Sequence, residues 1–320
     1  MYIIASSTIS HQPTFRNKGF AKQLCELKDP SVVLHPDYSA FIPVMERRRM
    51  SDVLKMAITC SIDCLQQAEL QQPGAIIVGT SMGSCTHTKN FLDKIISADG
   101  SLISPTSFIT STHNTIAGQI SLLLKNHSYN TTHTQNSLSF EQALTDGMLC
   151  LNEGCQNVLI GAADEVEKEL FNMEARLRTE DLHITSGASF FILTSEKTYN
   201  SLATLLNVAS FSLVNDISAS ITDFLKTNNL SESEIDLILF SGSSPNTIMQ
   251  LQKLFDVKKL FDYQKLSGVS FTNSAFAMSY AVDTLSDDSC KNVRTILVCN
   301  NLVPENLGLM LLKKYKHEVD

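Results

Sequence analysis

The stretch from Pro105 to Glu165 decides the fold: PTSFITSTHNTIAGQISLLLKNHSYNTTHTQNSLSFEQALTDGMLCLNEGCQNVLIGAADE. Its hydrophobic pattern predicts a helix over 114–124, a strand over 130–134, a second helix after Ser137 and a strand over 158–160. Strands that alternate with helices in this way indicate an α/β protein whose sheets are largely buried.

Segments upstream of this stretch continue the alternation. The first ten residues, MYIIASSTIS, are predicted to form a strand. Residues 48–70 place apolar side chains at helical spacing, which predicts an amphipathic helix. The short apolar run over 75–78 lies between Pro73-Gly74 and Gly79, so we expect a buried strand there.

The second half of the chain repeats the first in weak form. Three echoes in the same order predict an internal duplication. We place the boundary near Asn200, which gives halves of residues 1–200 and 201–320, the second one shortened. The paired segments are AIIVGTSMG (75–83) with LILFSGSSP (237–245), TSTHNTIAGQISLLL (110–124) with VSFTNSAFAMSYAVDTL (269–285), and VLIGAADE (158–165) with ILVCNNLV (296–303).

The bulk composition excludes several classes of protein. The chain has 320 residues, 43% of them hydrophobic, and a net charge of -8 without a basic stripe. Its length allows a large core, and its charge argues against nucleic-acid binding. No apolar run is long enough to span a membrane, and the N-terminus lacks the charged region of a signal peptide.

The eight cysteines are scattered along the chain. Cys60 and Cys64 are four residues apart in a helical pattern, but no His lies at ligand spacing beside them. We therefore expect no metal site and no cofactor. Reduced thiols in packing positions are typical of a cytoplasmic protein, which is the location that we predict.

Two local motifs imitate functional sites. The segment GTSMG (79–83) lacks the Lys-Ser/Thr ending of a phosphate-binding loop, so it is predicted to be a tight turn between strand and helix. Asp164 and Glu165 are adjacent on a predicted strand and point to opposite faces, so they are not expected to share an acid–base site.

Seven segments between Arg47 and Leu312 resemble, in their order and spacing, the motifs of the β-ketoacyl synthases. The resemblance implies a thiolase-like α/β fold of five layers, α-β-α-β-α, built from two pseudo-repeated halves. The segments are RRRMSDVLKMAI, IIVGTSMG, STHNTIAG, NVLIGAADE, SGASFFILTSE, LSESEIDLILFSGSS and YQKLSGVSFTNSAFAM.

The resemblance also implies the positions of a catalytic site. The family uses a Cys thiolate at a helix N-terminus as nucleophile, two His, a Lys and a glycine-rich turn. Here the Cys position holds Ser137, the His positions hold Ser241 and Val269, and the Lys position holds Gln264, next to Lys265. The glycine turn is replaced by CNNLVPENLG, so none of the family's catalytic residues is intact.

The distribution of His supports this interpretation independently of the alignment. Both family histidines belong to the C-terminal half, and this chain has no His between His183 and His317. His317 lies in the charged tail KKYKHEVD and is predicted to be solvated. A small shift of the alignment therefore cannot restore the two histidines.

The resemblance favours a non-catalytic, chain-length-factor-like subunit. Such a subunit forms a heterodimer with an active ketosynthase in fatty-acid or polyketide synthesis, of the aryl-polyene type for example, and meets an acyl carrier protein. Family members pair through the strand that leads into the nucleophile helix, here about Asn130–Asn136.

Two alternatives stay open. One is a divergent active acyltransferase or 3-oxoacyl-carrier-protein synthase, which uses Ser137 with His133 or His113 as base, or another thiol such as Cys85. No G-x-S-x-G motif surrounds Ser137. The other is a homodimeric acyl-binding or scaffold protein without a reaction.

Overall fold

The sheet repeats its own strand order. The computed structural model describes residues 1–28, 31–98, 104–167, 184–242 and 244–315. Within these ranges ten strands are joined in the order β3-β2-β4-β5-β1-β6-β10-β9-β7-β8. Adding five to each number of the first five strands reproduces the other five, read from the opposite end. The chain is therefore two copies of one sheet, and the predicted duplication is confirmed.

The strands of each half occupy a continuous part of the chain. The predicted boundary near Asn200 falls in the connection between β5 and β6, and the division of the chain there stays a prediction. The first half contains β1 (Tyr2–Ile9), β2 (Ala75–Gly79), β3 (Tyr129–His133), β4 (Asn157–Asp164) and β5 (Gly187–Thr194); the second contains β6 (Ala203–Ser212), β7 (Leu237–Ser241), β8 (Leu260–Asp262), β9 (Thr295–Asn300) and β10 (Asn306–Lys314).

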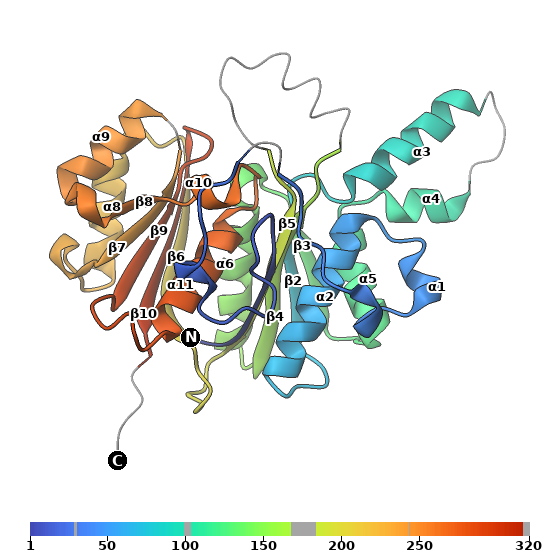
Figure 1. Ribbon diagram of the computed structural model, residues 1–320, viewed down its shortest axis with the longest axis horizontal. Coiled ribbons are helices and arrows are strands. Elements are labelled where there is room, and N and C mark those ends of the chain that lie inside the picture. Colours follow the sequence, from blue (N-terminus) through green and yellow to red (C-terminus); the bar gives the residue numbers. More distant parts are fainter. Residues whose placement is uncertain (29–30, 99–103, 168–183, 243, 316–320) are drawn as a thin grey trace.

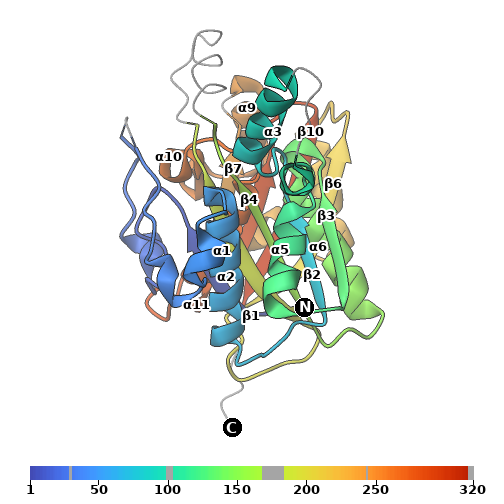
Figure 2. The ribbon, with the colours of Figure 1, turned by 90° about the vertical axis from the view of Figure 1, so that its right-hand side faces the viewer.

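Helices form three layers around the two halves of the sheet (Figures 1 and 2). The central pair, α6 (Ser139–Asn152) and α11 (Ser274–Ser286), packs with strands of both halves in one apolar core. One outer layer contains α2 (Asp52–Gln67) and α5 (Thr115–Leu124), and the other contains α8 (Ile217–Thr227) and α9 (Pro245–Leu254). This is the five-layer thiolase-like arrangement that the resemblance implied.

Further helices lie at the edges of these layers. In Figure 1, α3 (Cys85–Ser97) and α4 (Pro105–Thr110) project from the side of the first half, beside α2. The others are α1 (Val44–Arg47) and α10 (Gln264–Ser267), with 3₁₀ turns that include η1 (Phe20–Lys22) and η3 (Asn136–Leu138).

One of the three predicted echoes pairs the wrong helices. The echo matched 110–124 with 269–285, which correspond to α5 and α11. In the structure α5 precedes β3 and packs in an outer layer, whereas α11 follows β8 and packs in the centre. The repeat places α11 opposite α6. A polar start followed by an apolar run is common to many helices, so this pattern could not identify the layer.

The helix α2 shows why these residues form these elements. Its apolar side chains face the sheet and its core positions are fully buried. Cys60 and Cys64, weighed above as metal ligands, donate through Sγ to the carbonyls of Ala188 and Phe190 on β5. The two thiols therefore pack α2 against the sheet.

The two halves of the sheet meet over a short distance. β1 pairs with β5 along its length, but pairs with β6 only at Tyr2 and Ile3. Beyond this point the side chain of Gln67 occupies the free edge of β1. Its Oε1 accepts from the Ser6 amide at 3.2 Å and its Nε2 donates to the Ser6 carbonyl at 3.0 Å. A groove of about 1140 Å³ runs along this part of β1.

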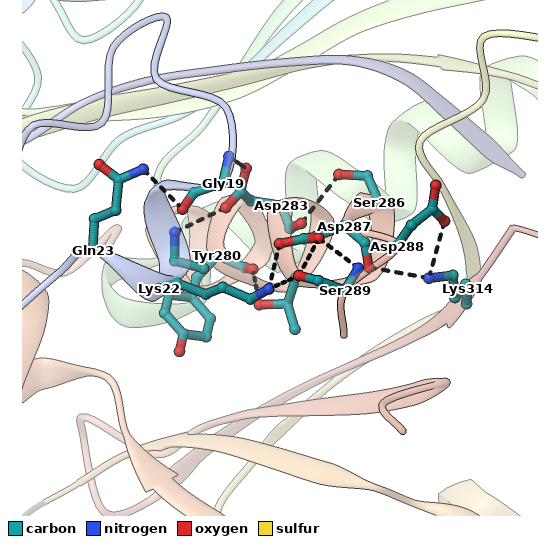
Figure 3. A network of polar contacts seen from close by, with 12 residues as sticks. Gly19, Lys22, Gln23, Tyr280, Asp283, Ser286, Asp287, Asp288, Ser289 and Lys314 are labelled. Atoms are coloured by element: carbon teal, nitrogen blue, oxygen red, sulfur yellow. Dashed lines mark hydrogen bonds and ion pairs between the residues drawn. The ribbon is translucent and has the colours of Figure 1, made fainter. Parts of the chain in front are cut away.

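A polar network holds the N-terminal loop against the end of α11 (Figure 3). The carboxylate of Asp283 accepts from the backbone amides of Gly19 and Ala21, each at 2.8 Å, and so caps η1. Lys22 pairs with Asp287 at 2.7 Å at the surface. The loop thereby covers one side of the central layer.

Across the described ranges, no helix has the length and apolar character that are required to cross a membrane.

Candidate functional site

Ser137 lies in the tight connection between β3 and α6. The preceding Asn136 has a φ of 55°, a left-handed conformation that Asn tolerates better than most residues. The chain then passes through η3 into α6, so Ser137 stands at the start of the central helix, as predicted. Its side chain is fully buried, with 0% exposure.

Amide side chains bind Ser137. The Nδ2 of Asn300, at the end of β9, donates to the carbonyl of Ser137 at 2.7 Å. The Nδ2 of Asn306, at the start of β10, donates to the Ser137 hydroxyl at 3.3 Å. Both partners come from the segment that replaces the family's glycine turn. The two halves of the chain are therefore joined at this position.

The network continues to Ser241 at the end of β7. The Ser241 hydroxyl donates to Oδ1 of Asn300 at 3.0 Å and accepts from the backbone amide of Asn301 at 3.2 Å. Oδ1 of Asn301 accepts from Thr247 at 2.6 Å. Nδ2 of Asn301 points to the carbonyls of the turn that follows β9, at 2.7 Å from that of Asn306. The Asn301 side chain therefore holds the turn between β9 and β10.

Gln264 and Val269 occupy the other two predicted positions. Oε1 of Gln264 accepts at 3.1 Å from the amide of Gly242, whose φ of 118° and close approach to Asn301 exclude a side chain. The Val269 carbonyl accepts from the Thr185 amide at 2.9 Å. The structure thus links Ser137 and Ser241 through Asn300, joins Gln264 to Gly242 next to Ser241, and places Val269 on a separate backbone bridge.

Lys265 does not replace the missing family Lys. Its Nζ lies 3.4 Å from Glu26, and both side chains are exposed. The residue at the predicted Lys position is therefore a neutral amide, and the adjacent cation points to the surface.

A buried carboxyl stands one helical turn after Ser137. Glu141 is fully buried, and its Oε1 accepts from Asn300 at 2.8 Å. Burial raises the pKa of Glu141 to about 7, against the smaller opposing effect of its hydrogen bonds. Gly308 on β10 lies so close that an added Cβ would stand 2.5 Å from Oε1, so β10 packs directly against the carboxyl.

The candidate bases for Ser137 are engaged elsewhere. Nε2 of His133 lies 2.8 Å from Asp146 on α6, and His113 packs against Gly83. Among the described residues, the side-chain partners of Ser137 are Asn300 and Asn306. The pair of Ser and His that nucleophilic catalysis requires is therefore not formed in this part of the chain.

Cys85, the other candidate nucleophile, begins α3. It is buried, and burial together with the carboxylates of Glu165 and Glu167 raises its pKa to about 11. A thiol with this pKa is protonated near neutral pH and is a weak nucleophile.

Asp164 and Glu165 serve different sites, as the alternation of strand side chains predicted. Asp164 accepts from the Thr80 hydroxyl at 2.7 Å and from the amides of Ser81 and Met82, which holds the turn after β2. Glu165 turns away from these groups. Its two oxygens accept from amides in the first turns of α2 and α3, at 3.0 and 2.9 Å.

The sequence did not reveal the partners of the predicted positions. Glu141, Asn300, Asn301, Asn306 and Ser274 form the site but carry no local motif. The Asn pair directly after an apolar strand was the one signal that could have pointed to them. His317 lies outside the described residues.

What the arrangement can do chemically follows from its composition. The groups around Ser137 are hydroxyls, amides and a carboxyl that burial keeps protonated up to about neutral pH. No cationic donor and no thiolate contact Ser137 in the described ranges. Its hydrogen bonds hold three segments of the chain together at Ser137.

Comparison with known families identifies the relatives of this chain. Residues 24–210 match the family profile of the N-terminal domain of β-ketoacyl synthases. None of the curated proteins matches the sequence.

Solved structures resemble the chain over nearly its whole length. The ishigamide ketosynthase/chain length factor aligns with a TM-score of 0.82 at 16% identity, covering 98% of this chain and 99% of that one. A type II PKS acyl-carrier protein in complex with its ketosynthase, bound to the hexaketide, gives 0.79 at 15%, covering 98% and 99%. The ketosynthase ApeO in complex with its chain length factor ApeC from Xenorhabdus doucetiae gives 0.75 at 13%, covering 98% of each. At these identities the likeness establishes the fold.

Proposed function

The chain belongs to the β-ketoacyl synthase family, and we propose that it is a non-catalytic, chain-length-factor-like subunit. It would pair with an active ketosynthase in fatty-acid or polyketide synthesis. Structures of similar fold are described as ketosynthases in complex with a chain length factor or with an acyl carrier protein, which supports both as partners of this chain.

One observation carries the proposal. The position of the nucleophile holds a buried Ser137 whose contacts are amides, and the positions of the other catalytic groups hold Ser241, Val269 and Gln264. Decarboxylative condensation requires a thiolate and donors for a developing negative charge. The replacement of these groups by a closed hydrogen-bond network supports a structural role.

The outer edge of β3 supports pairing with a second subunit. β3 is the terminal strand of its half of the sheet, and the described residues pair it only with β2. Exposed apolar side chains flank it on both neighbouring helices: Leu122 of α5 is 70% exposed and Leu149 of α6 is 55% exposed. A free strand edge between apolar side chains favours association with another sheet.

Co-expression with a ketosynthase that keeps its Cys and both His tests whether this chain is a non-catalytic subunit. We expect the two proteins to co-purify, and malonyl decarboxylation to require the ketosynthase. Decarboxylation by this chain alone would overturn the proposal. Acylation of the isolated chain that disappears in Ser137→Ala would establish the acyltransferase alternative. A stable homodimer that does not bind ketosynthases would establish the scaffold alternative.

The interface is tested separately with charged substitutions. Leu122→Asp and Leu149→Asp place a charge beside β3, and each should reduce co-purification with the ketosynthase at least about tenfold. Val257→Asp is the matched control, because Val257 is 61% exposed on the other half of the molecule. Equal loss in all three variants would exclude β3 as the interface.

A further inference from the structure

The helices α3 and α4 have almost no core of their own. α3 has 13 residues and buries only Cys85, its first residue, and α4 buries none of its six residues. By contrast, α6 has 14 residues and buries seven of them. The main neighbour of α3 is α4, against which it packs Phe91 on Phe108 with 5.7 Å between the ring centroids. Helices of this length are marginally stable in water without tertiary packing.

The same two helices expose a group of large apolar side chains. The group consists of Leu92, Ile95 and Ile96 of α3 with Phe108 and Ile109 of α4, and we call it the α3–α4 face. Ile96 is 82% exposed, and both members on α4 are 59% exposed. On α3 the three residues recur at helical spacing, so they share one side of the helix. Soluble proteins normally expose such side chains singly, so this group marks a surface that another molecule covers.

The base of the two helices adjoins the end of β3. The Thr132 hydroxyl on β3 donates to Oδ1 of Asn114, between α4 and α5, at 3.3 Å. The amide of Thr80, in the turn that leads to α3, donates to the carbonyl of His133 at 3.0 Å. In Figure 2, α3 lies above α5, with β3 beside α5. The two helices are therefore adjacent to the strand edge at which we propose the second subunit.

The β3 edge alone is too small for a stable interface. An interface of standard size takes about 20–30 residues from each partner. β3 has five residues, and the exposed apolar side chains on the helices beside it are Leu122 and Leu149. A subunit bound at β3 needs further surface, and the α3–α4 face supplies apolar surface next to this edge.

We propose that the ketosynthase bound at β3 also covers the α3–α4 face with an apolar surface of its own, and that α3 and α4 reach their full stability only in this complex. Burial of the face supplies the core that the two helices lack within one chain. The occupant is taken from the proposed function, on which this inference therefore rests.

Hydrogen exchange tests the stability of the two helices. In the isolated chain the backbone amides over 89–97 should exchange rapidly, and binding of the ketosynthase should slow them at least about tenfold. The amides of α11 are the internal control, because this helix is already buried within one chain and should change little. Equal protection of α3 with and without the ketosynthase would overturn the proposal. Protection that rises with the concentration of the chain alone would also overturn it, because a second copy would then cover the face.

Charged substitutions test the contact itself. Ile96→Asp and Ile109→Asp place a carboxylate on the α3–α4 face, and each should weaken binding of the ketosynthase at least about tenfold. Asn90→Asp is the matched control, because Asn90 is exposed and helical geometry places it on the other side of α3. This variant should bind as the wild type does. Equal loss of binding in all three variants would contradict the contact.

The variants beside β3 separate this contact from the proposed function. If Leu122→Asp and Leu149→Asp release the ketosynthase but Ile96→Asp and Ile109→Asp do not, pairing at β3 stands and the contact with the α3–α4 face is excluded. If the wild-type chain binds no ketosynthase, both the pairing and the contact are excluded.

Discussion

The two halves of the molecule end their equivalent strands in different chemistry. β4 ends at Asp164, followed by Glu165, and these carboxylates accept from backbone amides at the starts of helices and turns. β9 ends at Asn300, followed by Asn301, and these amides both donate and accept.

The difference shows how a fold can be kept while a site is closed. Carboxylates suit positions that are surrounded by backbone donors, and they fix the first half with charge-assisted hydrogen bonds. Amides can link hydroxyls, carbonyls and other amides in a chain, and they close the second half around Ser137. At Glu141 a carboxyl and an amide contact each other. Oε1 of Glu141 accepts from Asn300, and Oε2 has no hydrogen-bond partner among the described residues.

The largest expected loss of stability comes from the substitution of Asp164. Asp164→Ala leaves the Thr80 hydroxyl and the amides of Ser81 and Met82 without their acceptor. An unpaired buried donor such as the Thr80 hydroxyl costs about 1–3 kcal/mol and each partly buried amide less, so we expect a loss of about 4 kcal/mol in the free energy of unfolding. Urea denaturation measures it.

Asp164→Asn is the control for shape, and it should recover only part of the loss because its amide NH₂ faces donors. Full recovery would mean that charge is unimportant in this half.

The next largest effect is the change of stability with pH that Glu141 causes. The pKa of Glu141 is about 7 in the folded chain against 4.5 for a freely solvated Glu, because burial disfavours the ionised form. The stabilisation that its neutral form gives is complete below pH 4.5 and is lost as the pH rises to about 7. Over this window the stability of Glu141→Gln relative to the wild type should increase by about 3 kcal/mol.

Urea midpoints of both proteins at a series of pH values measure this difference, which cancels the contributions of other carboxyls. A difference that stays constant with pH would show that Glu141 is ionised throughout.

The smallest effect compares two threonines that donate to the residues at the ends of β4 and β9. Thr80 donates to the carboxylate of Asp164, whereas Thr247 donates to the amide oxygen of Asn301. Thr80→Val should cost about 2 kcal/mol, because it removes a charge-assisted bond and the acceptor of the Gly83 amide. Thr247→Val should cost about 1 kcal/mol. If thermal unfolding shows that Thr80→Val and Thr247→Val destabilise the protein equally, the hydrogen bonds of the two halves do not differ in strength.

Local patterns predicted the elements well. The apolar run of β2, the strand before Ser137 and the helix after it were confirmed within about two residues, because periodicity and turn residues act within a few positions. The predicted equivalence of 110–124 with 269–285 was wrong, because the layer in which a helix packs depends on its connections and not on its own sequence.

The site was predictable in part. Resemblance pointed to Ser137 and Ser241, which the structure links through Asn300, and to Gln264, which binds the amide next to Ser241. Asn300 lies 163 residues from Ser137 in the chain, so no window of sequence could pair them. Glu141 stands in a helix where an acid is ordinary, and burial alone makes it unusual.

The side chain of Gln67 has a consequence for aggregation of this protein. Its amide presents one donor and one acceptor to Ser6, as a residue of a neighbouring strand would. A bare strand edge is a template on which other chains aggregate. Because the Gln67 side chain occupies this part of β1, the groove there can stay open without pairing to another strand, whereas β3 and β8 remain the terminal strands of the sheet.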